Sequence, residues 1–242
     1  MGRKTKKFIL LAPVLLIIGI LSFINFPKDP DPFPSDEQVI ERITSFFSEI
    51  RPKIIQDRIF LDDRHVFVPF ISEDDGYGMS FWVWKNNEWI AASVSGGGQP
   101  MVWNGGEEAV IMWNLNPKDE VGEISIFVKK ERDFMVSGEL ATYQPRMGMM
   151  HRIPLEGKMY GAESFPDHWQ ELIKQYGEIQ SSDGQNEFLG LEGGLQVVAS
   201  FHDAKGKETF PHISFTGNSY STGDEFVEAV IQVHENELEG KY

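Results

Sequence analysis

The chain has 242 residues, a formal net charge of −15 and no cysteine. A chain of this length can bury a core without disulfides, and its negative charge opposes direct binding to nucleic-acid phosphates. No nucleic-acid partner is therefore expected, and cations, basic peptides or neutral glycans are the easier ligands.

The first 26 residues predict a membrane anchor. Residues 8–26 are nineteen uncharged positions that follow a basic start with Arg3, Lys4, Lys6 and Lys7. Nineteen helical residues cover roughly 28 Å, close to the bilayer's hydrocarbon thickness of about 30 Å. The basic flank predicts a cytoplasmic tail at 1–7 and an extracytoplasmic body. A cleaved signal peptide is the alternative, but the segment lacks the small residues of a cleavage site.

The part beyond residue 26 carries 18 Lys and Arg against 37 Asp and Glu, a net charge of −19. An extracytoplasmic body without cysteine is more typical of a bacterial cell envelope than of a eukaryotic secretory product. Its first segment, residues 27–34, has four prolines and predicts an extended stalk of roughly 25 Å. A loop packed against the domain is the alternative.

Two amphipathic helices are predicted. The first covers 36–50, with Ser35 and Gln38 at capping-box spacing, and ends before Pro52. The second begins at Ser164 and ends at Gly177.

The remaining pattern predicts strands joined by short turns, which favours antiparallel pairing. The fold class is therefore α+β, predominantly antiparallel β-sheet with two amphipathic helices, preceded by one N-terminal transmembrane helix. A boundary near 155–163 separates a helix-plus-sheet domain at 35–157 from a helix-plus-β subdomain at 158–242. The strands are expected at 65–71, 79–85, 88–94, 109–115, 123–130, 134–143, 195–202, 212–216 and 226–234.

The densest aromatic feature lies around a predicted turn at Asn86-Asn87. This turn would pair Trp84 with Trp89 and place Trp82 on the same face. An exposed face of this kind would suit a glycan or a peptide, so Trp82, Trp84 and Trp89 are the candidate ligand-binding residues. Burial of this face under the helix at 36–50 is the alternative.

Three glycine-containing loops invite functional interpretations. Residues 95–100 lack the Lys-Ser/Thr ending of a phosphate loop and predict a flexible connection. The acidic segments 73–78 and 183–187 lack the spacing of a calcium loop and predict turns.

The histidines do not form a recognisable metal or catalytic motif. His234-Glu235 begins like a zinc-protease helix, but Leu238 stands where the second ligand is required. His202 and His212 flank a predicted hairpin, whose two-residue turn would place them on opposite faces; only another register would bring them together. No serine or cysteine nucleophile motif is found. We therefore expect no catalytic residue, no metal ligand and no cofactor.

These observations predict a single-pass membrane protein acting non-catalytically as a binding, sensing or accessory protein of a bacterial cell envelope. Its partner would be a glycan, a peptide or another envelope protein, with the membrane bound through residues 8–26. One alternative is a surface hydrolase, directed at glycans, that uses two of the many carboxylates. Another is a regulatory partner of a second membrane protein.

Overall fold

The computed structural model describes residues 29–105, 108–130, 132–137, 140–144, 146–182, 195–223, 225 and 227–238. The tail at 1–7, the anchor at 8–26, residues 27–28 of the stalk and the predicted turn at 183–187 lie outside these ranges. Among the described residues, no helix is both long and apolar enough to cross a bilayer.

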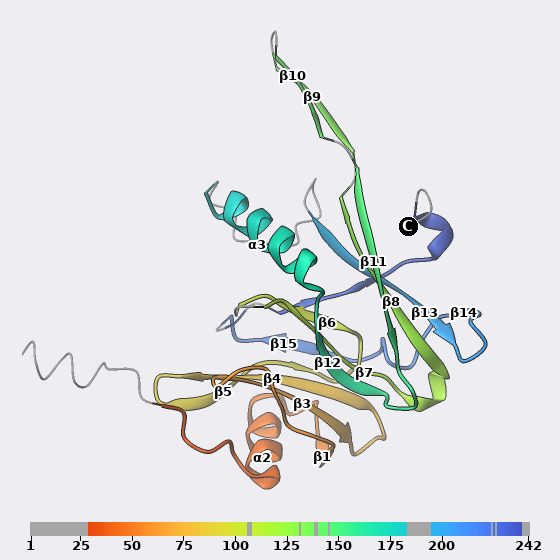
Figure 1. Ribbon diagram of the computed structural model, residues 1–242. Coiled ribbons are helices and arrows are strands. Elements are labelled where there is room, and N and C mark those ends of the chain that lie inside the picture. Colours follow the sequence, from red (N-terminus) through yellow and green to blue (C-terminus); the bar gives the residue numbers. More distant parts are fainter. Residues whose placement is uncertain are drawn as a thin grey trace, which may run out of the picture.

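The described chain is mostly antiparallel β-sheet with two α-helices, as expected for the α+β class (Figure 1). The α-helices are α2 (Asp36–Phe46) and α3 (Asp167–Ser182), and short 3-10 turns are η1 (Pro117–Asp119) and η2 (Glu235–Glu237). Sheet A contains β1 (Pro52–Ile55), β2 (Ile59–Phe60), β3 (His65–Ser72), β4 (Tyr77–Lys85), β5 (Glu88–Ser95) and β15 (Ser219–Ser221).

Two further sheets complete the body. Sheet B has the order β12-β7-β6-β16, with β6 (Met101–Trp103), β7 (Val110–Asn114), β12 (Tyr160–Ser164) and β16 (Val227–Ala229). Sheet C has the order β11-β8-β13-β14, with β17 paired to β13 in parallel. Its strands are β8 (Val121–Lys130), β11 (Met147–Pro154), β13 (Gln196–Asp203), β14 (Glu208–Thr209) and β17 (Ile231–Gln232).

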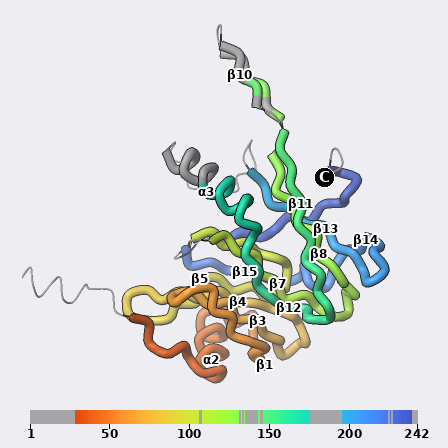
Figure 2. Tube along the Cα trace, viewed as in Figure 1, coloured from red at the N-terminus to blue at the C-terminus, as the bar shows by residue number. Residues whose placement is uncertain are grey.

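The elements stack in layers (Figure 2). One face of sheet A packs on α2 through Val39 and Ile43. Its other face packs on sheet B, where Val110 and Met112 of β7 meet Phe81 of β4. The second face of sheet B packs against sheet C and α3 in the largest apolar cluster. Sheet A is therefore buried on both faces, which explains why its strands are apolar on both sides.

Strands on both sides of the predicted boundary at 157/158 share sheets. Glu156 and Gly157 form the turn between β11 and β12, with φ of 49° and 83°. Beyond it, β12 pairs with β7 of sheet B and β13 pairs with β8 of sheet C. The apolar clusters likewise draw residues from both segments.

The two helices differ from prediction at their ends. α2 has the predicted capping box, in which the Gln38 amide donates to Ser35 Oγ and the Ser35 amide donates to the Gln38 side chain. It ends at Phe46, earlier than expected, and leaves that side chain 75% exposed. α3 begins at Asp167 and continues past Gly177 to Ser182, because one interior glycine weakens a helix by only about 1 kcal/mol.

Six strand predictions are confirmed and three are wrong. The confirmed ones are β3, β4, β5, β7, β8 and β13. Residues 212–216 form turns, and 226–234 breaks into β16 and β17, because buried Val230 bonds to Pro100 instead of continuing a strand. The segment 134–143 reverses direction, with Ser137 paired to Leu140.

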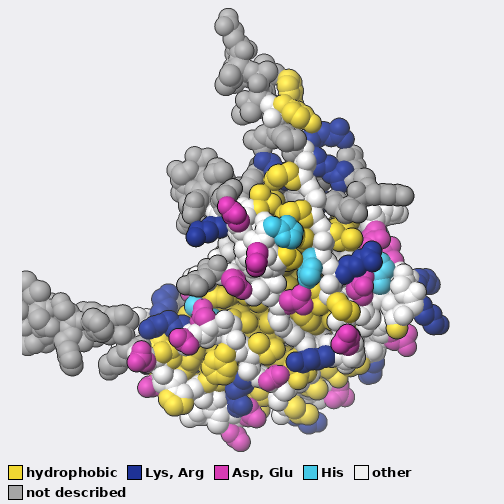
Figure 3. All heavy atoms as spheres, in the orientation of Figure 1, with side chains coloured by type: hydrophobic (Ala, Val, Ile, Leu, Met, Phe, Trp, Pro, Cys, Tyr) yellow, Lys and Arg dark blue, Asp and Glu magenta, His cyan; other side chains and the backbone are white. Residues whose placement is uncertain are grey.

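This reversal makes a two-stranded arm of β9 (Asp133–Ser137) and β10 (Leu140–Gln144), which projects from the body (Figure 1). Its cross-strand partners Phe134 and Tyr143 are 64% and 62% exposed. Figure 3 shows Lys and Arg side chains gathered near its base.

Candidate functional site

The tryptophan hairpin has the predicted register. Asn86 and Asn87 have φ of 55° and 63°, as a tight hairpin turn requires. Trp84 pairs with Trp89 across the strands, their rings 5.6 Å apart at 60°. Trp82 lies two residues before Trp84 on β4 and therefore on the same face as this pair, and the bulge in this hairpin falls on β5 at Ala92.

The face that carries the three tryptophans is covered. Trp82, Trp84 and Trp89 are 0%, 5% and 5% exposed, beneath α2 and Phe33. Trp82 Nε1 donates to Ser80 Oγ at 2.8 Å, and Trp89 Nε1 donates to the Asp31 carbonyl at 2.8 Å. The indoles of Trp82 and Trp89 thus bond within the protein, and the face presents no open aromatic surface, in agreement with the alternative interpretation, burial under the helix.

The contacts of Trp89 also place part of the predicted stalk on the domain. Asp31 accepts the indole hydrogen bond. The Phe33 ring meets Trp89 edge-on, with ring centroids 5.0 Å apart. Residues 31–33 therefore pack against the domain, as in the alternative to an extended stalk.

A groove of about 740 Å³ lies where several loops meet at one end of sheet A. Its walls are the α2–β1 connection, the β3–β4 turn, the glycine loop after β5, η1 with its cap, and the segment 213–218. These segments are far apart in the sequence. We take this groove as the candidate functional site, because it is a preformed polar cavity of a size typical for ligands.

The β3–β4 turn supplies the acidic wall. Ser72 Oγ donates to Asp74, the amide of Ser72 bonds to the Gly76 carbonyl at 2.8 Å, and Asp75 has a φ of 60°. The Ser72 hydrogen bond is the main cause that holds the pKa of Asp74 below its usual range. The turn prediction for 73–78 is thus confirmed, and Asp74 stays ionised into acidic conditions.

The glycine loop at 96–98 is a packed wall rather than the flexible connection that the sequence predicted. The Gly98 amide donates to the Ser214 carbonyl at 2.8 Å and the Gly96 amide to the Asn218 carbonyl at 2.9 Å. A Cβ on Gly98 would lie 1.6 Å from the Asn114 carbonyl oxygen. Glycine is needed here because two backbones touch.

The opposite wall is anchored by carboxylates. Asp119 accepts hydrogen bonds from the Ser214 amide at 2.9 Å, the Ser214 hydroxyl at 2.6 Å and the Ile213 amide at 3.1 Å. Asn218 and Tyr220 both donate to Glu49 Oε2. These bonds hold 213–220 against η1 and the α2–β1 connection, so the groove is built before any ligand arrives.

The groove has an excess of negative charge. Its lining includes the carboxylates of Glu49, Glu73, Asp74 and Asp75, and the cations of Arg51 and Lys118. Arg51 Nη1 lies 3.4 Å from Glu73 Oε2, in a solvent-exposed pair. Within the described ranges, no three His, Asp or Glu side chains are arranged to hold a metal ion.

The histidines of the sequence analysis lie outside the groove lining. His202 lies in β13 between two carboxylates, whereas His212 lies in a turn beside the Phe210 ring at 4.4 Å. His234 caps η2 and approaches Glu208. Because His212 lies in a turn rather than on a strand, the predicted hairpin with the two histidines on opposite faces is not formed.

Sequence reasoning did not find the groove because each wall looks like an ordinary turn by itself. The one signal was the glycine run at 96–98, which was interpreted as flexible.

No protein-family model matches this chain, and the searches of curated proteins and of solved structures also return no match. The groove and the histidine contacts therefore have to be interpreted from their own chemistry.

Proposed function

We propose that this chain is a membrane-anchored, extracytoplasmic binding protein of a bacterial cell envelope, which acts non-catalytically through the groove at the end of sheet A. The groove itself carries the proposal, because loops from five parts of the chain are tied together by hydrogen bonds around a polar cavity. Binding loops on a stable β-scaffold are the usual basis of such modules.

The chemistry of the lining indicates the ligand. Asp74 and Asp75 stand beside exposed backbone at the β3–β4 turn, and Glu49 lies across the cavity. An acidic cavity in an acidic body repels anions and attracts cationic groups. A peptide segment with Lys or Arg side chains fits this lining best, and a neutral glycan that bonds to carboxylates is the second choice.

The binding test compares groove variants with a matched control. A soluble form starting at residue 29 is titrated calorimetrically with lysine-containing and uncharged peptides and with neutral envelope glycans. The double variant Asp74→Asn/Asp75→Asn should weaken binding by about three- to tenfold, as expected for two exposed charge contacts. Asp63→Asn, at the other end of β3, should bind normally. If the double variant and the Asp63→Asn control bound these ligands with equal affinity, the proposal that the groove is the binding site would be wrong.

The membrane anchor at 8–26 is tested separately. Protease added to intact cells without an outer barrier should digest the body, while the segment before residue 27 stays with the membrane. Full protection, or release of a mature form lacking the first 26 residues, would contradict the anchored topology.

A further inference from the structure

The C-terminal part of the chain forms a strap across two sheets. We use this name for Glu225 and residues 227–238. The strap pairs with β6 of sheet B through β16, then with β13 of sheet C through β17, and ends in η2. Both of its strands are short, so side chains contribute much of its attachment: Val230 and Leu238 are buried in apolar clusters, and polar contacts add to them.

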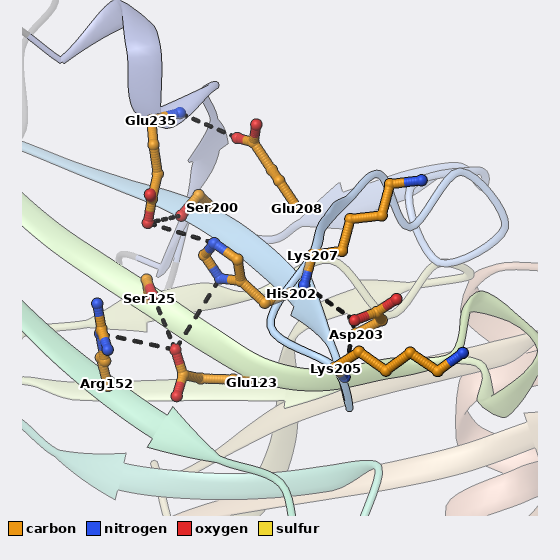
Figure 4. Close-up of polar contacts among 10 residues, drawn as sticks. All are labelled: Glu123, Ser125, Arg152, Ser200, His202, Asp203, Lys205, Lys207, Glu208 and Glu235. Atoms are coloured by element: carbon orange, nitrogen blue, oxygen red, sulfur yellow. Dashed lines mark hydrogen bonds and ion pairs between the residues drawn. The ribbon is translucent and has the colours of Figure 1, made fainter.

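Three of these contacts join a histidine to a carboxylate. Glu225 Oε1 lies 3.7 Å from His65 Nε2, and Glu235 Oε1 lies 3.3 Å from His202 Nε2. The strap's own His234 has its Nδ1 3.5 Å from Glu208 Oε1. Figure 4 shows Glu235 reaching down to His202, with Glu208 beside it.

His202 has a carboxylate on each side of its ring. Opposite Glu235, its Nδ1 is 3.9 Å from Glu123 Oε1 of β8 and makes no hydrogen bond, although it is buried. Ser125 and Ser200 donate to Glu123 and Glu235, and Arg152 Nε of β11 lies 3.7 Å from Glu123 (Figure 4). The His202 side chain is only 11% exposed.

His65 repeats this arrangement at the other end of the strap. Its Nδ1 is 2.8 Å from both Asp62 carboxylate oxygens, and its Nε2 faces Glu225. The ring packs on Trp103 of β6 at 4.4 Å and on Phe81 of β4 at 5.8 Å. Trp103 Nε1 also donates to Glu225 at 3.5 Å.

The protonation state of an imidazole decides whether a position between two carboxylates is attractive or repulsive for the ring. A neutral imidazole has one N–H group, so its other nitrogen would turn a lone pair toward a carboxylate. A protonated ring donates at both nitrogens and carries a positive charge between two negative ones. Histidine side chains change charge between about pH 5 and 8.

We propose that attachment of the strap depends on the charge of His65 and His202. The strap is held when these two rings are protonated between their carboxylates, and it is loosened when they are neutral. Attachment is therefore stronger at acidic than at alkaline pH. His234 is more exposed and adds a smaller contribution at the same end as His202. The proposal concerns the strap alone and does not depend on a ligand in the groove.

The first test is hydrogen exchange of the full chain in detergent micelles, corrected for the pH dependence of chemical exchange. Protection of amides in 227–238 should fall by about tenfold or more between pH 5.5 and pH 8, as expected for partly buried ion pairs. Amides of β4 and β5 should change little. Equal protection of the strap at both pH values would overturn the proposal.

Variants identify the groups responsible. The double variant Glu225→Gln/Glu235→Gln keeps side-chain size but removes both charges, so it should lower protection at pH 5.5 and abolish most of the pH dependence. Glu237→Gln is the matched control, since Glu237 is an exposed carboxylate on the same 3-10 turn as Glu235. A double variant that kept the full pH dependence would refute the assignment.

A distance measurement covers the case in which the double variant destabilises the whole fold. Because the chain has no cysteine, Lys205→Cys and Glu237→Cys accept spin labels only at these exposed positions. The distance distribution between them should be narrow at pH 5.5 and broaden at pH 8. An unchanged distribution would show that the strap does not respond to protons.

Discussion

Replacing Trp84 by alanine tests whether the tryptophan hairpin is core or surface. The side chain is 5% exposed and meets Trp89 edge-on across the strands. Emptying a buried aromatic site costs about 3 to 5 kcal/mol, and the lost aromatic pair accounts for about 1 kcal/mol of that. For a domain of this size the expected fall in Tm is about 6 to 20 °C.

The assay is urea unfolding followed by far-UV circular dichroism, on a soluble form that starts at residue 29. Starting at residue 35 would remove Phe33, which covers Trp89. Tyr143→Ala on the exposed arm is the matched control and should change stability by less than about 0.5 kcal/mol. If Trp84→Ala cost less than about 1 kcal/mol at an unchanged denaturant slope, the face would be open and a ligand site there would become the better hypothesis.

Two further predictions concern the groove. Gly98→Ala should destabilise the fold by about 3 kcal/mol or more, because its Cβ would meet the Asn114 carbonyl oxygen at 1.6 Å and force two backbones apart; the Tm measures this. Ser72→Ala should raise the pKa of Asp74 toward its usual value, as followed by NMR titration, while the pKa of Asp203 stays low because the amides of Lys205 and Lys207 hold it down. Since the pKa of Asp74 is lowered by folding, its stabilising effect is present above the usual Asp value of about 4 and is lost as the pH falls through the folded value, so Ser72→Ala should also reduce acid sensitivity. An unchanged Asp74 titration would show that the Ser72 contact does not set it.

The features that were predicted well from sequence are local. The Asn86-Asn87 turn sets the register of β4 and β5, and the spacing of Ser35 and Gln38 sets the start of α2. Each depends on residues within a few positions of one another, so the pattern carries all of the required information.

The features that were missed depend on contacts between distant segments. The break at Val230 occurs because its side chain enters the main core while its amide bonds to Pro100. The turns at 212–216 form around Asp119, about a hundred residues earlier. The strands β1, β2, β6, β11, β12, β14 and β15 were also missed, mostly because they are short or, like β11, lack a clear alternation. The groove depends on several such contacts between distant segments, so no single stretch of sequence predicts it.

The docking of Asp31 and Phe33 on Trp89 would limit how far the body can stand from the membrane in the anchored topology proposed above. With residues 8–26 in the bilayer, as we propose, only the four residues 27–30 separate the bilayer from Asp31, and four residues span at most about 14 Å. The body would then lie close to the lipid headgroups, and its partners would have to bind it at the membrane surface. A pull transmitted through residues 27–30 would load the hydrogen bond from Trp89 Nε1 to the Asp31 carbonyl first, and the Phe33–Trp89 ring contact after it.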